Sequence, residues 1–440
     1  MTDIQHIEQT IQQLLQEVPP KAGRRVSVTL PLTGINLDSL PQTGDQRYFW
    51  MRPDKGVQWL GLGVSWQCGK PGNGHLAALA EDAETLGASI DHIDPEGCGS
   101  APRLSLVSQD DGGLLTLPLV QLQFSPSGNL VTVSPDPDRP DSWRDTLDQL
   151  QGALDTPAEP PPPPPTLTLV DQAPQAPVWL RLAEQAIEEL NNDHLEKLVL
   201  GRRITLTAQR RLSPEELLRT LGTRHSRSTL FAADRENGCW VGASPEILID
   251  LQGEHFYSEA VAGTVRRDTY ETVDNELGEW LLRDPKNRHE HQLVVDSLVD
   301  VLEPLSEELE RGNQPVLLKL RGLQHLHTPV SGRLKRPLHP LRIAHQLHPT
   351  PAVGGTPKQA AVEWLESNEP LDRRWFTGLA GWIDTAGNGS LCVVLRCAHL
   401  QQERVDLYAG AGLVADSDSL AEWEETELKL DNMIKALQDA

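Results

Sequence analysis

The feature that most constrains the fold of this chain is its mixture of short β-type segments and long amphipathic helices. Residues 197–208 (KLVLGRRITLTA) are typical of a strand, whereas residues 179–192 and 419–438 repeat apolar side chains at helical spacing. A run at 390–414 predicts a β-hairpin. Hairpins mixed with long helices favour an α+β fold with largely antiparallel sheets.

A run of six prolines divides the chain into two regions. Residues 1–18 predict an amphipathic helix, and short β-rich segments follow, among them 57–66. Prolines in series adopt an extended, solvated conformation, so Pro160–Pro165 is expected to form an external linker or loop. We therefore expect a β-rich N-terminal region at 1–165 and a second region at 166–440.

Charge and cysteine content argue against several classes of protein. The 440 residues carry a formal net charge of −24, whereas nucleic acids and anionic membranes attract clustered basic residues. The apolar runs are far shorter than the roughly 20 residues that span a bilayer, and the N-terminus lacks the pattern of a secretory signal. The five cysteines are scattered, so we expect neither disulfides nor a zinc cluster, but a cytoplasmic protein.

Charged and small residues gather near the C-terminus. Glu422, Glu425 and Lys429 follow the spacing i, i+3, i+7 and share one helical face. This face is either solvated or part of a binding site. Gly410 and Gly412 follow a strand just before this helix. Such small residues let a carboxylate approach backbone N–H groups, although a tight hairpin explains them equally well.

An arginine interrupts the apolar segment 391–400, which we predict to be one continuous strand. Side chains alternate along a strand, so Arg396 is expected to share a face with Val394 and Cys392. A buried arginine needs a partner, and its guanidinium suits a bidentate contact with a carboxylate. A structural salt bridge and a ligand contact both fit this pattern.

Glu290 lies between two histidines in a predicted helix. Three consecutive residues point in different directions around a helix, so His289, Glu290 and His291 cannot form a zinc-binding face. Glu290 is either solvated or one of the few carboxylates of a Mg²⁺ site, because Mg²⁺ prefers few protein oxygens together with water and substrate.

Three further polar residues are open to two interpretations each. Lys197 begins a strand, Glu246 follows a turn proline, and His325 lies in a β-type segment. A surface lysine, an exposed turn glutamate and a core histidine explain them as well as catalytic roles do.

Ten blocks of sequence, taken in order, resemble those of the chorismate-utilising enzymes, which comprise isochorismate, salicylate, anthranilate and aminodeoxychorismate synthases. The resemblance begins near Leu182 and continues to the C-terminus, while the first 165 residues match much more loosely. The blocks are KLVLGRR, VGASPEIL, EAVAGTVRR, NRHEHQLVVD, QHLHTPVSGRL, LHPTPAVGGTP, FTGLAGWID, LCVVLRCA, YAGAGLVADSD and EWEETELK.

Three positions resemble the water-adding members of the family. Ammonia-using enzymes typically carry glutamine where this chain has Lys197, and aminodeoxychorismate synthases carry a nucleophilic lysine where it has Ala262. Phe376 replaces a tyrosine usual in anthranilate-type enzymes. No amidotransferase sequence is fused to the chain, so no glutaminase subunit is expected. The resemblance thus implies an isochorismate synthase, an isomerase that adds water at C2 of chorismate and expels the 4-hydroxyl.

The resemblance also implies a role for each candidate residue. Lys197 would be the base that activates water, and Glu246 the acid that protonates the leaving hydroxyl. Glu290 and Glu425 match the Mg²⁺ carboxylates, with Glu422 as a further ligand or a supporting group. The residues matched to chorismate are Arg396 for the enolpyruvyl carboxylate, His325 and Ala352 beside the ring, and Gly263, Thr264, Gly410, Gly412 and Lys429 around the ring carboxylate.

Two alternative functions remain open at this point. A salicylate synthase shares the lysine and Mg²⁺ but then eliminates pyruvate from isochorismate. A catalytically silent chorismate-binding protein is the other alternative, although such a protein need not keep Lys197, Glu246, Glu290 and Glu425. The tryptophan-containing N-terminal region favours an enzyme of menaquinone or phylloquinone biosynthesis.

The fold that the resemblance implies is a single large α+β domain. Two stacked, largely antiparallel sheets are flanked by helices, and strands of the N-terminal region belong to the same sandwich. The proline run would then be a surface loop. We expect a monomer that acts on a small molecule.

Overall fold

The computed structural model describes residues 3–18, 23–35, 41–44, 46–156 and 162–440. Pro160 and Pro161 of the predicted linker lie outside these residues, and Pro162–Pro165 have no regular secondary structure. No helix in the described part of the chain is long and apolar enough to span a bilayer. All five cysteines are described and carry free thiols.

The first of two large sheets contains strands from both regions of the chain. It is antiparallel except for the pair β1–β5. Across this sheet the described strands are β10 (Leu167–Ala173), β11 (Lys197–Ala208), β23 (Arg404–Leu413), β22 (Cys397–Gln401), β13 (Gly238–Ser244), β12 (Thr229–Arg235), β2 (Arg47–Arg52), β3 (Val57–Leu62), β8 (Val120–Phe124), β9 (Leu130–Val133), β1 (Arg25–Pro31) and β5 (Ile90–Ile93), with β19 (Gly355–Thr356) paired to β11.

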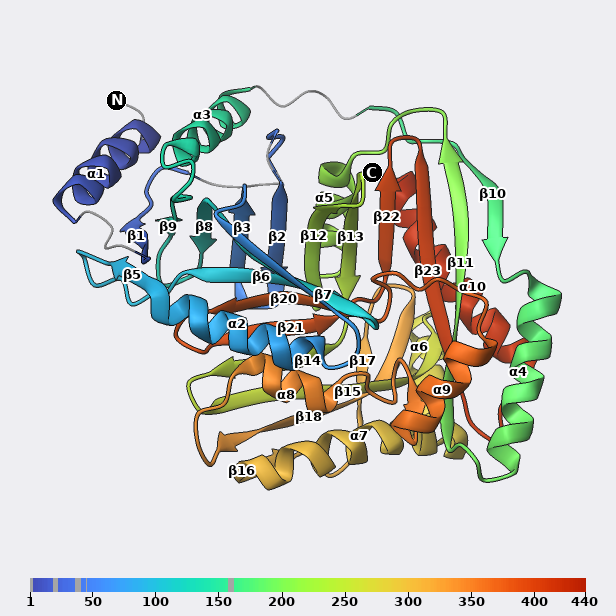
Figure 1. The fold of residues 1–440 in the computed structure, drawn as a ribbon. Coiled ribbons are helices and arrows are strands. Elements are labelled where there is room, and N and C mark those ends of the chain that lie inside the picture. The colour runs from blue at the N-terminus through green and yellow to red at the C-terminus, as the bar shows by residue number, and fades with distance from the viewer. Residues whose placement is uncertain (1–2, 19–22, 36–40, 45, 157–161) are drawn as a thin grey trace.

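The second sheet is antiparallel throughout its described pairs and crosses the first in Figure 1. Its strand β6 comes from the N-terminal region and pairs with β20 from the C-terminal region. Across this sheet the described strands are β16 (Ser306–Arg311), β18 (Leu323–Leu334), β15 (His255–Arg266), β14 (Ile247–Gln252), β21 (Gly389–Val393), β20 (Leu379–Asp384), β6 (Arg103–Gln109), β7 (Gly112–Leu117) and β4 (Trp66–Pro71), with β17 (Val316–Lys319) paired to β18.

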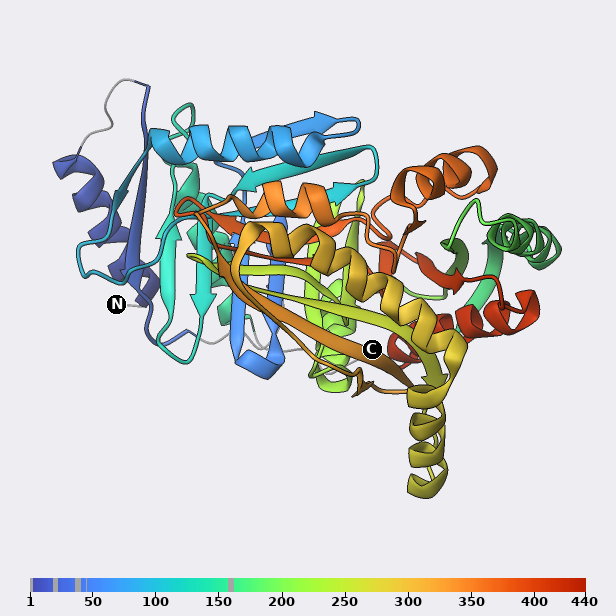
Figure 2. The same cartoon turned by 90° about the horizontal axis from the view of Figure 1, so that it is seen from below.

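Helices cover the outer faces of the sheets. Figure 2 shows α2, α8 and α7 side by side over the second sheet, and their apolar residues form one cluster with it. The apolar faces of α1, α3 and α5 pack on the first sheet. The described helices are α1 (Asp3–Glu17), α2 (His75–Ser89), α3 (Ser142–Asp155), α4 (Ala176–Asn191), α5 (Pro214–Arg224), α6 (Glu271–Arg283), α7 (Pro285–Leu305), α8 (Pro340–Leu347), α9 (Lys358–Asn368) and α10 (Ser419–Gln438), with a 3-10 turn at Pro53–Lys55.

An aromatic core joins the two sheets. Trp50 of β2 and Trp382 of β20 meet edge to face with ring centroids 6.3 Å apart, and Trp240 of β13 stacks on Trp375 at 5.5 Å. Such ring pairs prefer these geometries because of their quadrupoles. The core therefore contains side chains from both the N-terminal and the C-terminal regions, as expected for one sandwich.

Four short connections carry the chain from one sheet to the other. They lie between β3 and β4, between β7 and β8, between β13 and β14, and between β21 and β22. The prediction of one strand at 391–400 was therefore wrong, and the predicted hairpin begins only at β22. The β-rich segment 57–66 contains β3 and the first residue of β4. Arg396 has φ 48° and Gly63 has φ 65°, left-handed conformations that break a strand. Arg396 is consequently not placed by strand alternation with Val394 and Cys392.

Side-chain caps begin the two helices that carry predicted metal ligands. The side chain of Asp284 accepts from the N–H of Asn287 at the start of α7, and that of Asp418 accepts from the N–H of Ala421 at the start of α10. Such caps satisfy N–H groups that have no partner within the helix. They fix the first turns of both helices next to β15 and β23.

Candidate active site

A small buried cavity between the two sheets brings the predicted site residues together. Its volume is about 80 Å³, which holds on the order of six water molecules if each needs about 10–15 Å³. Glu422 is the one predicted residue that does not line it. The predicted residues that do are Lys197, Glu246, Gly263, Thr264, Glu290, His325, Ala352, Arg396, Gly410, Gly412, Glu425 and Lys429.

Lys197 and Glu290 form a buried ion pair on one side of the cavity. Lys197 Nζ lies 3.0 Å from Glu290 Oε1, and the lysine side chain is 1% exposed. Burial opposes ionisation of Glu290, but the ammonium groups of Lys197 and Lys286 outweigh it and lower the pKa of the carboxyl. A Cβ at position 412 would lie 2.2 Å from Glu290 Oε1, so only glycine fits there.

The pKa of Glu246 is shifted in the opposite direction to that of Glu290. It lies in the connection between β13 and β14 and is 2% exposed. Burial and the charge of Glu259 raise the pKa of the Glu246 carboxyl to about 8, although Lys197 acts in the other direction. Its only described side-chain hydrogen-bond partner is the Thr350 hydroxyl, at 3.5 Å. At neutral pH this carboxyl is mostly protonated and can donate a proton.

Arg396 and His325 form a second polar pair in the cavity wall. Arg396 Nη2 lies 2.8 Å from His325 Nε2, and among the described residues Arg396 has no carboxylate within ion-pair distance. Burial lowers the pKa of Arg396 to about 10, still far above neutrality. A buried guanidinium without an ion-pair partner is suited to an anionic ligand.

The hydrogen bonds of His325 fix its tautomer. Burial, then the charges of Arg396 and Lys429, lower the pKa of His325 well below its ordinary value, so the ring is neutral. Because a guanidinium can only donate, Nε2 is the acceptor and Nδ1 carries the hydrogen. Nδ1 lies 3.2 Å from both Gly263 O and Thr264 Oγ1, which therefore orient the ring.

A β-bulge shapes the backbone below this histidine. The register of β15 against β18 shifts between Ala262 and Thr264, and Gly263 has φ 72°. Beyond this bulge, β15 continues to Arg266. The N–H of Thr264 donates to Asn287 Oδ1 at 3.3 Å, so it is already engaged in this structure.

Lysines engage all three predicted metal carboxylates. Glu425 Oε1 lies 2.7 Å from Lys429 Nζ, which also donates to Gly410 O at 2.7 Å. Glu422 forms an ion pair with Lys286, behind the cavity. Burial and the charge of Glu425 raise the pKa of Glu422 to about 7, so negative charge is concentrated here.

The donor set fits a hard divalent cation. Glu290, Glu422 and Glu425 all raise the pKa of Lys286, and of the three only Glu422 forms an ion pair with it among the described residues. Carboxylate oxygens are the ligands that Mg²⁺ prefers. Within the described ranges no three acidic, histidine or cysteine side chains are close enough to ligate one ion. A cation here must therefore replace the lysines as partner of at least some of these oxygens.

Two residues of the site were missed by the sequence analysis. Lys286 stands four residues before Glu290 on α7, a spacing that places both on one helical face and was available in the sequence. Thr350 lies 104 residues from Glu246, the side chain it contacts. No local pattern could have revealed that contact.

Comparison with known proteins identifies relatives of the whole chain. The family described as "Chorismate binding enzyme" matches residues 9–438. The isochorismate synthase MenF of Bacillus subtilis (strain 168) is 30% identical over 94% of this chain and 92% of its own. The salicylate biosynthesis isochorismate synthase of Pseudomonas aeruginosa is 41% identical over 59% of this chain, and the match spans 54% of that protein.

A solved structure confirms the predicted fold. MenF, the menaquinone-specific isochorismate synthase from Escherichia coli, superposes with a TM-score of 0.80 at 23% identity, covering 98% of this chain and 99% of that one. The α+β architecture with two largely antiparallel sheets is therefore shared along the full length of the two chains.

Proposed function

We propose that this chain, which belongs to the family of chorismate-binding enzymes, is an isochorismate synthase that adds water at C2 of chorismate and releases the 4-hydroxyl. The observation that carries the proposal is the pair of groups at one cavity: a protonated carboxyl at Glu246 and an amine at Lys197. Water addition with loss of hydroxide needs one acid and one base, each typically worth about 10²–10⁴-fold in rate.

Glu246 has the properties of the acid. Hydroxide is a poor leaving group, so a proton must reach the 4-oxygen as the bond breaks. The raised pKa of about 8 keeps this proton on Glu246 near neutral pH. The buried position of the carboxyl keeps competing water away from it.

Lys197 is placed to act as the base. The Lys197 ammonium must first release a proton to water, and with it the ion pair with Glu290, before the amine can accept a proton from the nucleophilic water, because an ammonium has no free lone pair. Gly412 packs against both side chains of this pair, since an added Cβ would lie 3.0 Å from Lys197 Cε and 2.2 Å from Glu290 Oε1.

Positive groups are placed to hold the two carboxylates of the substrate. Arg396, oriented by His325, is the candidate for the enolpyruvyl carboxylate. Glu290 and Glu425, with Glu422 behind them, are the candidates to hold Mg²⁺, which would supply positive charge to the ring carboxylate. Gly263, Thr264, Gly410 and Lys429 lie around that position, and Ala352 forms the wall beside the ring.

The length of one match supports a role in quinone biosynthesis. The relative named MenF aligns over 94% of this chain, whereas the salicylate-pathway relative aligns over 59%. Because the relative named MenF aligns over almost the whole chain, we propose that the product feeds menaquinone or phylloquinone synthesis.

Product analysis tests the proposed reaction. The purified chain is incubated with chorismate and Mg²⁺, with and without EDTA, and the products are separated by chromatography. Isochorismate as the only product, lost with EDTA, is the expected result. Salicylate with pyruvate would show a salicylate synthase instead, and chorismate binding without turnover would show a silent binding protein. A Lys197→Ala sample controls for spontaneous rearrangement.

A further inference from the structure

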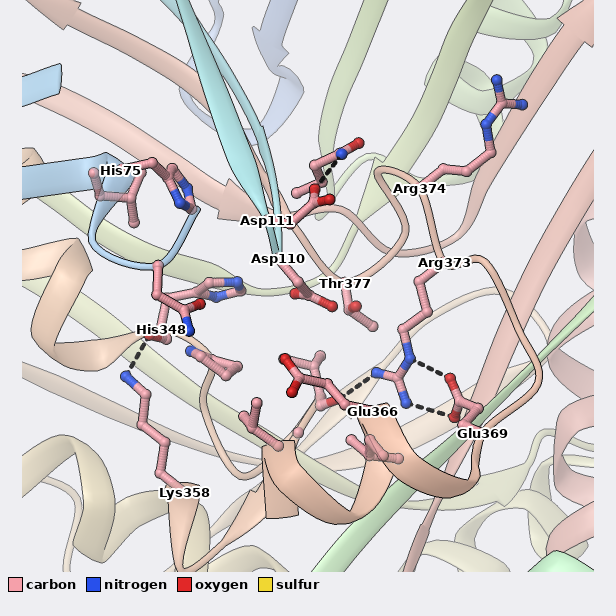
Figure 3. Close-up of a pocket in the computed structure, with 18 of the residues that line it drawn as sticks. His75, Asp110, Asp111, His348, Lys358, Glu366, Glu369, Arg373, Arg374 and Thr377 are labelled. Atoms are coloured by element: carbon pink, nitrogen blue, oxygen red, sulfur yellow. Dashed lines mark hydrogen bonds and ion pairs between the residues drawn. The ribbon is translucent and has the colours of Figure 1, made fainter. Parts of the chain in front are cut away.

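A second and larger cavity lies directly beside the candidate active site. Its volume is about 510 Å³, within the range of roughly 300–1,000 Å³ typical of small-molecule sites. It lies among the start of α2, the turn between β6 and β7, the end of α8, α9 and residues 371–374 (Figure 3). Val353 and Thr377 line both cavities, so the two share a wall.

The positive groups of this cavity are already engaged. Arg373 forms two contacts with Glu369, at 2.5 and 2.7 Å, and donates to the carbonyl oxygens of Val199 and Val353. Lys358 donates to the carbonyl of His348. Arg374 pairs with a glutamate outside the cavity. Arg373 and Arg374 are therefore paired with carboxylates, whereas the ammonium group of Lys358 has no carboxylate partner among the described residues.

Carboxylates of the same cavity are free. Asp110 and Glu366 make no hydrogen bond or ion pair with any described residue, and they lie at different sides of the cavity in Figure 3. Both residues are exposed to solvent. Five carboxylates and three basic side chains line the cavity, so its lining carries net negative charge, which disfavours chorismate or any other anion.

Two buried histidines add unsatisfied polar atoms. Both ring nitrogens of His348 and Nε2 of His75 lack a partner among the described residues, and each residue is 7% exposed. Burial lowers the pKa of His348 to about 3, so its ring is neutral. His75 Nδ1 lies 3.1 Å from Gly72 O and must donate to it, which leaves Nε2 as an acceptor. Buried acceptors of this kind require a donor.

We propose that this cavity binds a small organic cation, a primary amine carried on a short apolar body. The ammonium group would donate to Asp110 or Glu366 and to a histidine acceptor, while the apolar part would contact Leu76, Val362 and Leu365. The described lining offers no three-ligand set for a bare metal ion. This inference goes beyond the proposed function, because it assigns no catalytic role to these residues.

Three matched probes test the inference on the full chain. Calorimetry compares 2-phenylethylamine, 2-phenylethanol and phenylacetate, which differ only in the polar end. The amine is expected to bind saturably, and the alcohol and the acid at least about tenfold more weakly. Equal binding of the three probes, or no saturable amine binding below about 10 mM, overturns the proposal.

Variants of the lining locate the binding. Asp110→Asn combined with Glu366→Gln should weaken amine binding about tenfold or more. Glu363→Gln, on α9 but outside the cavity, is the matched control and should bind as the wild type does. Val362→Trp keeps every charge but fills the space, so it too should abolish binding. Undiminished binding in either the double variant or the filled variant contradicts the proposal.

Discussion

Glu246 and Glu290 are two buried glutamates of one cavity, yet their carboxyls are held in opposite states. The pKa of Glu246 is raised to about 8, whereas that of Glu290 is lowered. Burial acts in the same direction on both. The difference comes from their neighbours: Glu290 lies 3.0 Å from an ammonium group, while Glu246 has another carboxylate, Glu259, as its strongest charged neighbour. Partners rather than burial therefore decide which glutamate is acid and which is a permanent anion.

The largest expected effect comes from removing the base on the Glu290 side. Lys197→Ala should lower kcat by about 10²–10⁴-fold, because water is then left without a proton acceptor. Chorismate binding, measured by calorimetry, should persist, since Arg396 remains. Lys435→Ala, an exposed lysine of α10, serves as the control. A Lys197→Ala enzyme with near-normal turnover would refute the base assignment.

Removing the acid should have a comparable or slightly smaller effect. Glu246→Gln keeps the shape and neutrality of the protonated side chain but cannot release a proton, so kcat should fall by about 10²-fold or more. In the wild type, kcat should decrease as the pH rises through about 8, because Glu246 then loses its proton. Normal turnover of the variant would place the acid elsewhere.

The two glutamates also differ in what their replacement does to the free energy of unfolding. Glu290→Gln leaves Lys197 buried without its partner and should cost about 3–5 kcal/mol in free energy of unfolding. Glu246→Gln should cost nothing at pH 7 and should instead stabilise the fold, because glutamine cannot ionise in the unfolded state. The folded-state pKa of Glu246 lies above its ordinary 4.5, so its contribution to stability falls as the pH rises from about 4.5 to about 8. Urea unfolding at pH 6 and pH 9 measures both; equal costs would contradict the comparison.

The smallest expected effect is on the Mg²⁺ concentration that the enzyme needs. Glu425→Gln should raise the Mg²⁺ concentration needed for half-maximal activity by about tenfold or more, since it removes a charged oxygen donor. Glu424→Gln, exposed on the same helix, is the matched control and should leave the requirement unchanged. An unaltered Mg²⁺ dependence in Glu425→Gln would remove this residue from the metal site.

The sequence predicted the helices and the grouping of site residues better than the path of the chain between sheets. The helices expected at 179–192 and 419–438 rest on local apolar spacing, and both are present in the structure as α4 and α10. Arg396 was misplaced because alternation was assumed to continue where the chain changes sheets. Roles assigned through family resemblance remain predictions, although the cavity brings twelve of those residues together.

Electrostatic partners were the part that no local pattern could supply. The Lys197–Glu290 pair joins residues 93 positions apart, so it depends on how α7 packs against β15 and on where β11 lies. No local pattern predicts the raised pKa of Glu246 either, because it results from burial in the connection between β13 and β14. The larger cavity beside the site is lined by five segments that lie apart in the sequence, and no sequence pattern predicted it.

The titration of Glu246 itself tests the account most directly. Infrared difference spectra between the wild type and Glu246→Gln, recorded from pH 5 to pH 10, isolate the C=O stretch of this protonated carboxyl. We expect the band to be present at pH 7 and to disappear with a midpoint near pH 8. A midpoint near the ordinary value of 4.5 would mean that Glu246 is ionised in the working enzyme and cannot be its acid.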